Sequence, residues 1–145
     1  MFKSSSLVLT LLLIGVASGC KKKSQRSDFP NVSFEEYVYL NNPSSYDLGV
    51  PGGAIFHTGG YRGLIIYRRY LNGGIDDFAI YDRACPEHYA ENCSQLELSN
   101  DGLFAICPCG NEKYLLFDGS PVDEATISLF PYSASLSNNV LYIRN

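Results

Sequence analysis

Four cysteines in the second half of the chain restrict its possible folds most strongly. They fall in two groups, Cys85 with Cys93 and Cys107 with Cys109, and each group follows an expected strand. An even number of cysteines indicates disulfides in an oxidising compartment, unless a metal ion takes the thiolates first. We expect both cysteine-bearing loops to project from one end of the same sheet.

The N-terminal segment indicates which compartment applies. Lys3 precedes an apolar run of about ten residues, 7–16, whereas a helix that spans a bilayer needs about 20. The run ends in Val-Ala-Ser-Gly-Cys at 16–20 and is followed by Lys21-Lys22-Lys23. This order resembles the lipobox of bacterial lipoproteins, which implies cleavage before Cys20 and acylation of Cys20. We therefore expect a lipoprotein of the cell envelope, on its periplasmic face or at the cell surface, with the bilayer as a partner.

The sequence divides into three parts on this interpretation. Residues 1–19 are the lipoprotein signal peptide, residues 20–30 are a polar, lipidated and disordered tether, and residues 31–145 are one domain. Loss of Lys3 with the signal leaves 10 basic against 15 acidic residues, a formal charge of about −5. Such a balance argues against nucleic acid as a partner.

The domain is predicted to be all-β. Asn72-Gly73 and Asn138-Asn139 are typical of hairpin turns, and the first predicts that 63–70 pairs with 78–81. Short strands separated by Gly- and Pro-rich turns favour a small antiparallel sandwich or barrel. The expected strands are 33–40, 63–70, 78–81, 103–106, 113–117, 127–132 and 140–143.

Signals for catalysis are weak. The sequence has no nucleophile elbow, no phosphate-binding loop and no His-Glu-x-x-His motif. Turns explain the pairs Gly52-Gly53 and Gly59-Gly60, and the pair Asp76-Asp77 is expected to be solvated beside a hairpin. We expect that the protein is not an enzyme.

The residues that could bind a metal or cofactor are concentrated in two motifs between Asp82 and Gly119. They are Cys-Pro-Glu-His at 85–88, with Cys93 beyond it, and Cys-Pro-Cys-Gly-Asn at 107–111, followed by an aromatic strand and an Asp-Gly turn. Here the sequence resembles the Rieske family, especially the divergent Rieske-like lipoproteins of Gram-negative bacteria. The resemblance implies a small Rieske-like antiparallel domain in which each loop gives one cysteine and one histidine to a [2Fe–2S] cluster.

The resemblance transfers only part of the ligand set. Cys85 and Cys107 take the places of the two cysteine ligands. His88 takes the place of the first histidine, three residues after Cys85 where the family usually has two. Gly110 stands where the second histidine is expected and offers no side-chain ligand. Cys93 and Cys109 fall on or near two further cysteines that bridge the loops in many Rieske proteins.

Three interpretations of these residues stay open. The first is a metal-free domain with Cys93–Cys109 and Cys85–Cys107 disulfides, where a bridge closing about 15 residues contributes about 3 kcal/mol. The second is a [2Fe–2S] cluster held by Cys85, His88, Cys107 and either Cys109 or an unidentified group. The third is a zinc site made by Cys85, His88, Cys107 and Cys109.

The function expected from the first interpretation is a binding or structural role on a degenerate Rieske-like scaffold. The alternative is periplasmic one-electron transfer through a cluster. The partner is then a redox protein or a component of an assembly in the envelope.

Overall fold

The computed structural model describes residues 28–145, so the predicted signal peptide and Cys20 lie outside the described residues. Within 28–145, no helix is long and apolar enough to cross a membrane. All sheets are antiparallel, which confirms the predicted all-β class. The first sheet contains β1 (Glu35–Tyr39), β10 (Val140–Arg144) and β9 (Ser133–Ser137); the second contains β2 (Ala54–His57), β3 (Leu64–Arg68) and β4 (Phe78–Asp82); the third contains β5 (Glu97–Leu98), β6 (Phe104–Ile106), β7 (Lys113–Leu115) and β8 (Pro121–Val122). The described residues also include the short 3₁₀ segments η2 (Pro43–Gly49) and η3 (Ile75–Asp77).

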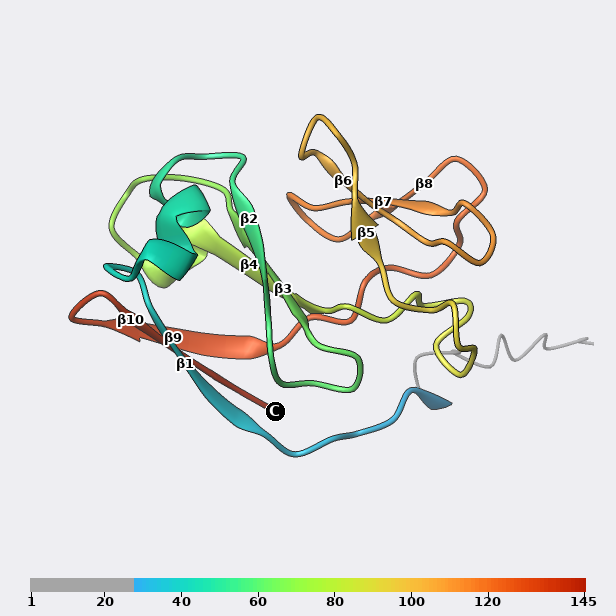
Figure 1. The fold of residues 1–145 in the computed structure, drawn as a ribbon, viewed down its shortest axis with the longest axis horizontal. Helices are drawn as coiled ribbons and strands as arrows, with labels where there is room; N and C mark the ends of the chain where they lie inside the picture. Colours follow the sequence, from blue (N-terminus) through green and yellow to red (C-terminus); the bar gives the residue numbers. More distant parts are fainter. Residues whose placement is uncertain (1–27) are drawn as a thin grey trace, which may run out of the picture.

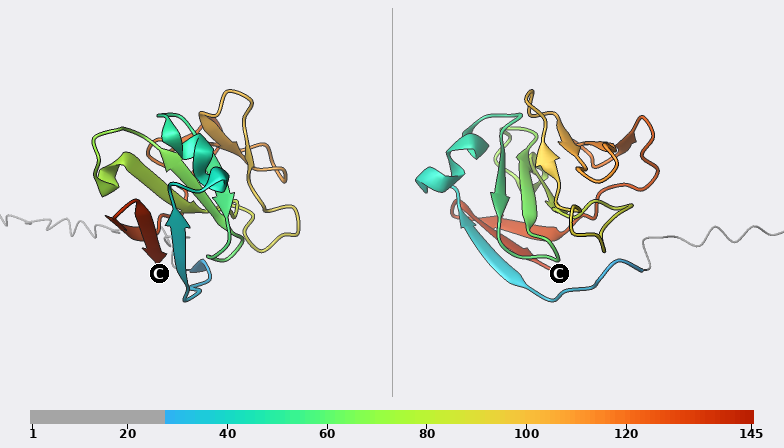
Figure 2. Two further views of the ribbon diagram at one scale, coloured as in Figure 1. Left: turned by 60° about the vertical axis from the view of Figure 1, so that its left-hand side comes forward. Right: turned by 45° about the vertical axis from the view of Figure 1, so that its right-hand side comes forward.

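The sheet β2–β3–β4 lies between the other two sheets, as the ribbon views show (Figures 1 and 2). Successive side chains of a strand point to opposite faces, and β3 and β4 are buried on both. One face packs on the sheet of β1, β9 and β10 in a core formed by Val38, Leu48, Leu64, Ile66, Phe78, Ile80, Leu141 and Ile143. The other face packs on the third sheet and the cysteine loops in a core formed by Ile65, Tyr67, Ala79, Tyr81, Cys85, Leu96, Ala105, Cys107, Tyr114, Leu116, Ala125 and Leu129, which we call the disulfide-side core.

Most of the expected strands are present. β3 pairs with β4 as predicted, with Leu64 opposite Asp82. Asn138 and Asn139 have φ of 49° and 62°, the left-handed conformation that a tight hairpin turn requires. The connection between β3 and β4 is longer than a two-residue turn because η3 lies within it.

The prediction of a strand over residues 127–132 is wrong. Only Pro131 bridges Tyr81, and no ladder forms. The reason is the path of this segment, which crosses from one sheet to another. The amide of Leu129 donates to the carbonyl of Gly119 at 2.9 Å, whereas the amide of Tyr132 donates to the carbonyl of Ile80 at 2.9 Å.

Contacts with the domain begin inside the segment predicted to be a tether. The ring of Phe29 stacks on that of Phe130, with ring centroids 3.5 Å apart. It also meets the edges of Tyr61 and Tyr89. The chain therefore packs against the domain from Phe29 onward.

The pair Asp76-Asp77 behaves differently from the expectation. Asp76 is exposed, but Asp77 is buried with 1% of its surface exposed. Its carboxylate accepts hydrogen bonds from the amides of Asn72 and Gly73 and pairs with Arg68 at 3.2 Å. A turn that bends back on itself collects amide donors, so one of the two carboxylates is drawn inside rather than solvated.

Asp82, at the end of β4, joins three separate segments. Its buried carboxylate accepts the amides of Tyr61 and Arg62 from the β2–β3 turn and the amide of Ala84 from the first cysteine loop. The hydroxyl of Tyr132, from the returning chain, donates to it at 2.8 Å. Gly60 allows this close approach: its φ is +64°, and a Cβ there would lie 2.5 Å from the Asp82 carboxylate.

We expect Asp82→Ala to lower the free energy of unfolding by about 2–3 kcal/mol, because one buried and two part-buried amides lose their acceptor. Chemical denaturation followed by circular dichroism measures the change. Asp76→Ala removes an exposed carboxylate in η3, before the same strand, and is the control, which should stay within about 0.5 kcal/mol of the parent. Equal effects of the two substitutions would contradict the role of Asp82.

Candidate functional site

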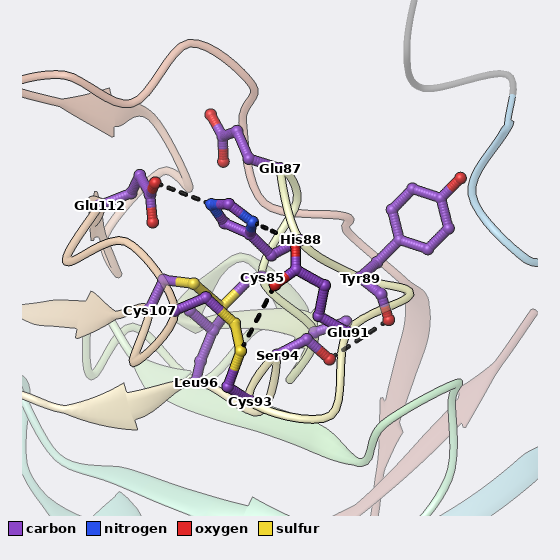
Figure 3. The surroundings of a disulfide bond; sticks show 12 residues. Cys85, Glu87, His88, Tyr89, Glu91, Cys93, Ser94, Leu96, Cys107 and Glu112 are labelled. Carbon is purple, nitrogen blue, oxygen red and sulfur yellow. Dashed lines mark hydrogen bonds and ion pairs between the residues drawn. A yellow bond between two sulfur atoms is a disulfide. The ribbon is translucent and has the colours of Figure 1, made fainter.

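Both cysteine-bearing loops lie beside the third sheet, next to each other (Figures 1 and 3). The first loop follows β4, and its two legs run antiparallel because the amide of Cys85 donates to Ser94 at 2.6 Å and that of Leu96 to Arg83 at 2.7 Å. The second loop connects β6 to β7. It closes through the amide of Cys107, which donates to the carbonyl of Glu112 at 2.9 Å.

The four cysteines form two disulfides between these loops. Cys85 pairs with Cys107, with Cα atoms 5.5 Å apart, and Cys93 pairs with Cys109, with Cα atoms 5.3 Å apart. Both pairings are the ones that the sequence predicted for the metal-free interpretation. The first pair is fully buried in the disulfide-side core, whereas Cys93 is exposed and Cys109 half-buried.

His88 lies between two carboxylates (Figure 3). Its Nδ1 is 2.7 Å from Glu91 Oε1, and its Nε2 is 3.0 Å from Glu112 Oε1. The hydrogen bonds to Glu91 and then to Glu112 raise the pKa of His88 above its ordinary value, although burial opposes this. Both ring nitrogens are donors in the charged imidazolium, so this arrangement matches a protonated histidine.

Glu112 also occupies the space in front of Gly110. A Cβ built on Gly110 would collide with the Glu112 carboxylate, so any side chain at position 110 would displace it from His88. The other oxygen of this carboxylate, Oε2, is buried and accepts no hydrogen bond among the described residues. The lack of a side chain at position 110 and the placement of Glu112 are therefore linked.

Glu87 fastens the first loop to the chain that follows β8. Burial opposes its charge, but the Tyr114 hydroxyl and the amides of Thr126 and Ile127 hold the pKa of the Glu87 carboxyl below its ordinary value. Burial and the neighbouring Glu87 raise the pKa of Tyr114. Arg62 adds a second fastening by donating to the Glu91 carbonyl at 3.1 Å.

The structure brings the predicted ligand residues together, but their donor atoms are already engaged by other groups. The sulfur atoms of Cys85, Cys107 and Cys109 lie within 4.8 Å of one another. All three are engaged in disulfides, and a thiolate is needed to bind metal. Both nitrogens of His88 are engaged by carboxylates, and Gly110 has no donor. The described arrangement therefore does not fit a [2Fe–2S] cluster or a zinc ion at these residues.

Sequence reasoning did not find Glu87, Glu91 and Glu112. Each stands within or beside a cysteine motif, so a signal was present: three carboxylates close to the histidine expected to bind metal. An anionic surround favours the charged imidazolium over the neutral ring that binds metal. Their convergence on two partners, His88 and Tyr114, depends on tertiary structure.

No family model matches this sequence, and a search of curated proteins finds no match. Eleven chains of solved structures match its fold. The cyanobacterial plasma membrane Rieske protein from Synechocystis PCC 6803 is 14% identical with a TM-score of 0.49, and the match covers 63% of this chain and 86% of that one. The NirD protein of E. coli is 17% identical with a TM-score of 0.47, covering 79% and 98%. The ferredoxin of carbazole 1,9a-dioxygenase from Nocardioides aromaticivorans IC177 is 11% identical with a TM-score of 0.42, covering 65% and 86%. At such identities a likeness concerns the fold alone, and the chemistry of the site rests on its own residues.

The raised pKa of His88 predicts a pH-dependent contribution to stability. The contribution is fully present below the pKa of about 6.5 of an unfolded histidine, and it is lost as the pH rises through the higher folded pKa. We expect His88→Gln to lower the free energy of unfolding by about 1 kcal/mol near pH 6 and by less at pH 9. Urea denaturation at a series of pH values measures it.

Glu112→Gln should reduce the same pH dependence, because it removes one of the two charges that face the imidazolium. Glu124→Gln makes the same chemical change at an exposed position outside the site and serves as the control. A difference between His88→Gln and the parent that stays constant from pH 6 to pH 9 would show that His88 is not charged in the folded protein.

Proposed function

We propose that this protein is a lipid-anchored component of the cell envelope whose Rieske-like domain binds no cluster and has a binding or structural role. The observation that carries the proposal is the state of His88, whose two ring nitrogens face Glu91 and Glu112. An imidazole that ligates iron needs a free nitrogen lone pair and usually gives its other N–H to a single partner. An imidazolium held between two carboxylates offers no lone pair.

The disulfides replace the stabilisation that a metal centre gives to loops of this kind. The third sheet has strands of only two or three residues, too short to be stable without further support. The two bridges span sequence separations of 22 and 16 residues. On the chain-entropy argument each contributes about 3 kcal/mol, which suits a small domain in an oxidising compartment.

A cleft lined by none of the four cysteines supports a binding role. Its volume is about 760 Å³, and it lies between the η2 segment and the turn from β5 to β6. Apolar Leu40 and Leu98 line it together with the amides of Asn42 and Asn100, and Asp47 is the one charged residue among the described lining residues. A few polar groups on an apolar surface are typical of small-molecule sites. The lining favours a neutral or singly cationic ligand that bears hydrogen-bonding groups.

One-electron transfer through a cluster is the second candidate function. It is favoured by the three sulfur atoms of Cys85, Cys107 and Cys109 lying within 4.8 Å of one another. It would require reduction of both disulfides and a fourth ligand in place of Gly110. Metal analysis separates the two candidates.

We expect the mature protein, purified without oxygen after co-expression with cluster-assembly machinery, to be colourless and to contain less than about 0.1 iron, zinc or sulfide per chain. Alkylation under denaturing conditions should find no free thiol at the four cysteines of the domain, because all four are in disulfides. A Cys85→Ser variant is the control for thiol detection. Two irons and two sulfides per chain would instead establish the cluster.

The anchor has its own test. We expect the full chain, expressed in a bacterium given a labelled fatty acid, to carry the label and to sediment with membranes. Cys20→Ala should abolish both, because Cys20 is the proposed site of acylation, while Cys93→Ala should leave both unchanged. Label retained on the Cys20→Ala chain would contradict the lipid anchor.

A further inference from the structure

The two disulfides differ sharply in their access to solvent. Cys85 and Cys107 have no exposed surface, so an external thiol cannot reach the bond between them. Cys93, by contrast, is an exposed residue of the first loop (Figure 3). Thiol–disulfide exchange depends on access to the sulfur that is attacked. We call Cys93–Cys109 the outer disulfide and Cys85–Cys107 the inner disulfide.

Cys109 connects the two bonds in space. Its sulfur lies within 4.8 Å of both sulfur atoms of the inner disulfide, whereas Cys93 does not belong to that group of three. Rupture of the outer disulfide at Cys93 therefore leaves a thiolate at Cys109 beside the inner one. The loops already hold the attacking sulfur and its target close together, so the second exchange is intramolecular.

We propose that the two disulfides form a relay, in which an external dithiol reduces the outer bond and Cys109 passes the electrons to the inner one. This goes beyond the function proposed above and rests on its metal-free state. The domain then accepts two electrons per event from a dithiol, stoichiometrically. The co-reactant is a protein or small-molecule dithiol in the compartment that the chain occupies.

The steps balance as follows. A thiolate of the dithiol attacks Cys93, a mixed disulfide forms there, and Cys109 leaves as a thiolate with the electron pair. Cys109 attacks Cys85, the bond from Cys85 to Cys107 breaks, and Cys107 leaves as a thiolate. The second thiol of the dithiol resolves the mixed disulfide at Cys93. One dithiol becomes a disulfide and loses two protons, and the domain now has one bridge, Cys85–Cys109, and two thiols that take up those protons.

Loop connectivity favours attack of Cys109 at Cys85. Attack at Cys107 would instead close a ring across Pro108 alone, whereas a Cys85–Cys109 bridge joins the two loops as the present bonds do.

The test determines which cysteines form the disulfide in each of two matched variants. In Cys93→Ser the free thiol arises on Cys109, and in Cys109→Ser it arises on Cys93. Each oxidised, metal-free protein is held under native conditions, quenched with acid, alkylated in denaturant and mapped by mass spectrometry. We expect Cys93→Ser to show alkylated Cys107 and a Cys85–Cys109 bridge, and Cys109→Ser to keep its alkylation on Cys93. Alkylation confined to Cys109 in the first variant overturns the relay.

Kinetics on the wild-type protein keep the inference testable if a single variant fails to fold. Under native conditions with dithiothreitol, we expect the inner disulfide to be reduced about tenfold faster in the wild type than in Cys93→Ser/Cys109→Ser, which has no outer bond. Equal rates overturn the relay. Circular dichroism of each variant checks that it is folded, and iron in the purified wild type would count against the metal-free state separately from the exchange result.

Discussion

The buried bond between Cys85 and Cys107 is the constraint on which the rest of the site depends. It joins the end of β4, a strand of the middle sheet, to the end of β6, a strand of the third sheet, inside the disulfide-side core. Because the strands of the third sheet are very short, their ladders alone contribute little. The bond and the surrounding apolar side chains hold the third sheet against the middle one, and this fixes where Cys93, Cys109 and His88 lie.

The carboxylates of Asp82 and Glu87 also hold the chain in place around the first cysteine loop. Asp82, three residues before Cys85, collects amides from the β2–β3 turn and from the start of the first cysteine loop. Glu87 does the same for the segment that leaves β8, through Thr126 and Ile127. In both places a carboxylate accepts hydrogen bonds from backbone amides that lie outside the strand ladders. These amides would otherwise be buried without partners. The loops are thus held at both ends, and the disulfides lie between the fixed points.

The sequence predicted much of the fold because the pattern of apolar residues along each strand is a local property of the sequence. β3 and β4 are apolar at nearly every position, so their pairing and burial on both faces could be anticipated from residues 63–70 and 78–81. The segment 127–132 has the same local character, yet it crosses between two sheets, and nothing local records which neighbours a crossing segment will meet. Asp77 was missed for a similar reason, since its donors come from the turn that folds over it.

At the candidate site, the sequence alone did not distinguish between disulfides and a metal site. Cysteine spacing and the family resemblance identified both disulfide pairs, but they also left a metal site open, because Cys85, His88, Cys107 and Cys109 are the same residues under either interpretation. The difference lies at Gly110 and Glu112. A side chain at position 110 and the present place of the Glu112 carboxylate exclude each other, and that carboxylate, with Glu91, holds His88 through both ring nitrogens. Gly110 thus offers no side-chain ligand, and the lack of a Cβ there leaves the space that the Glu112 carboxylate fills beside His88.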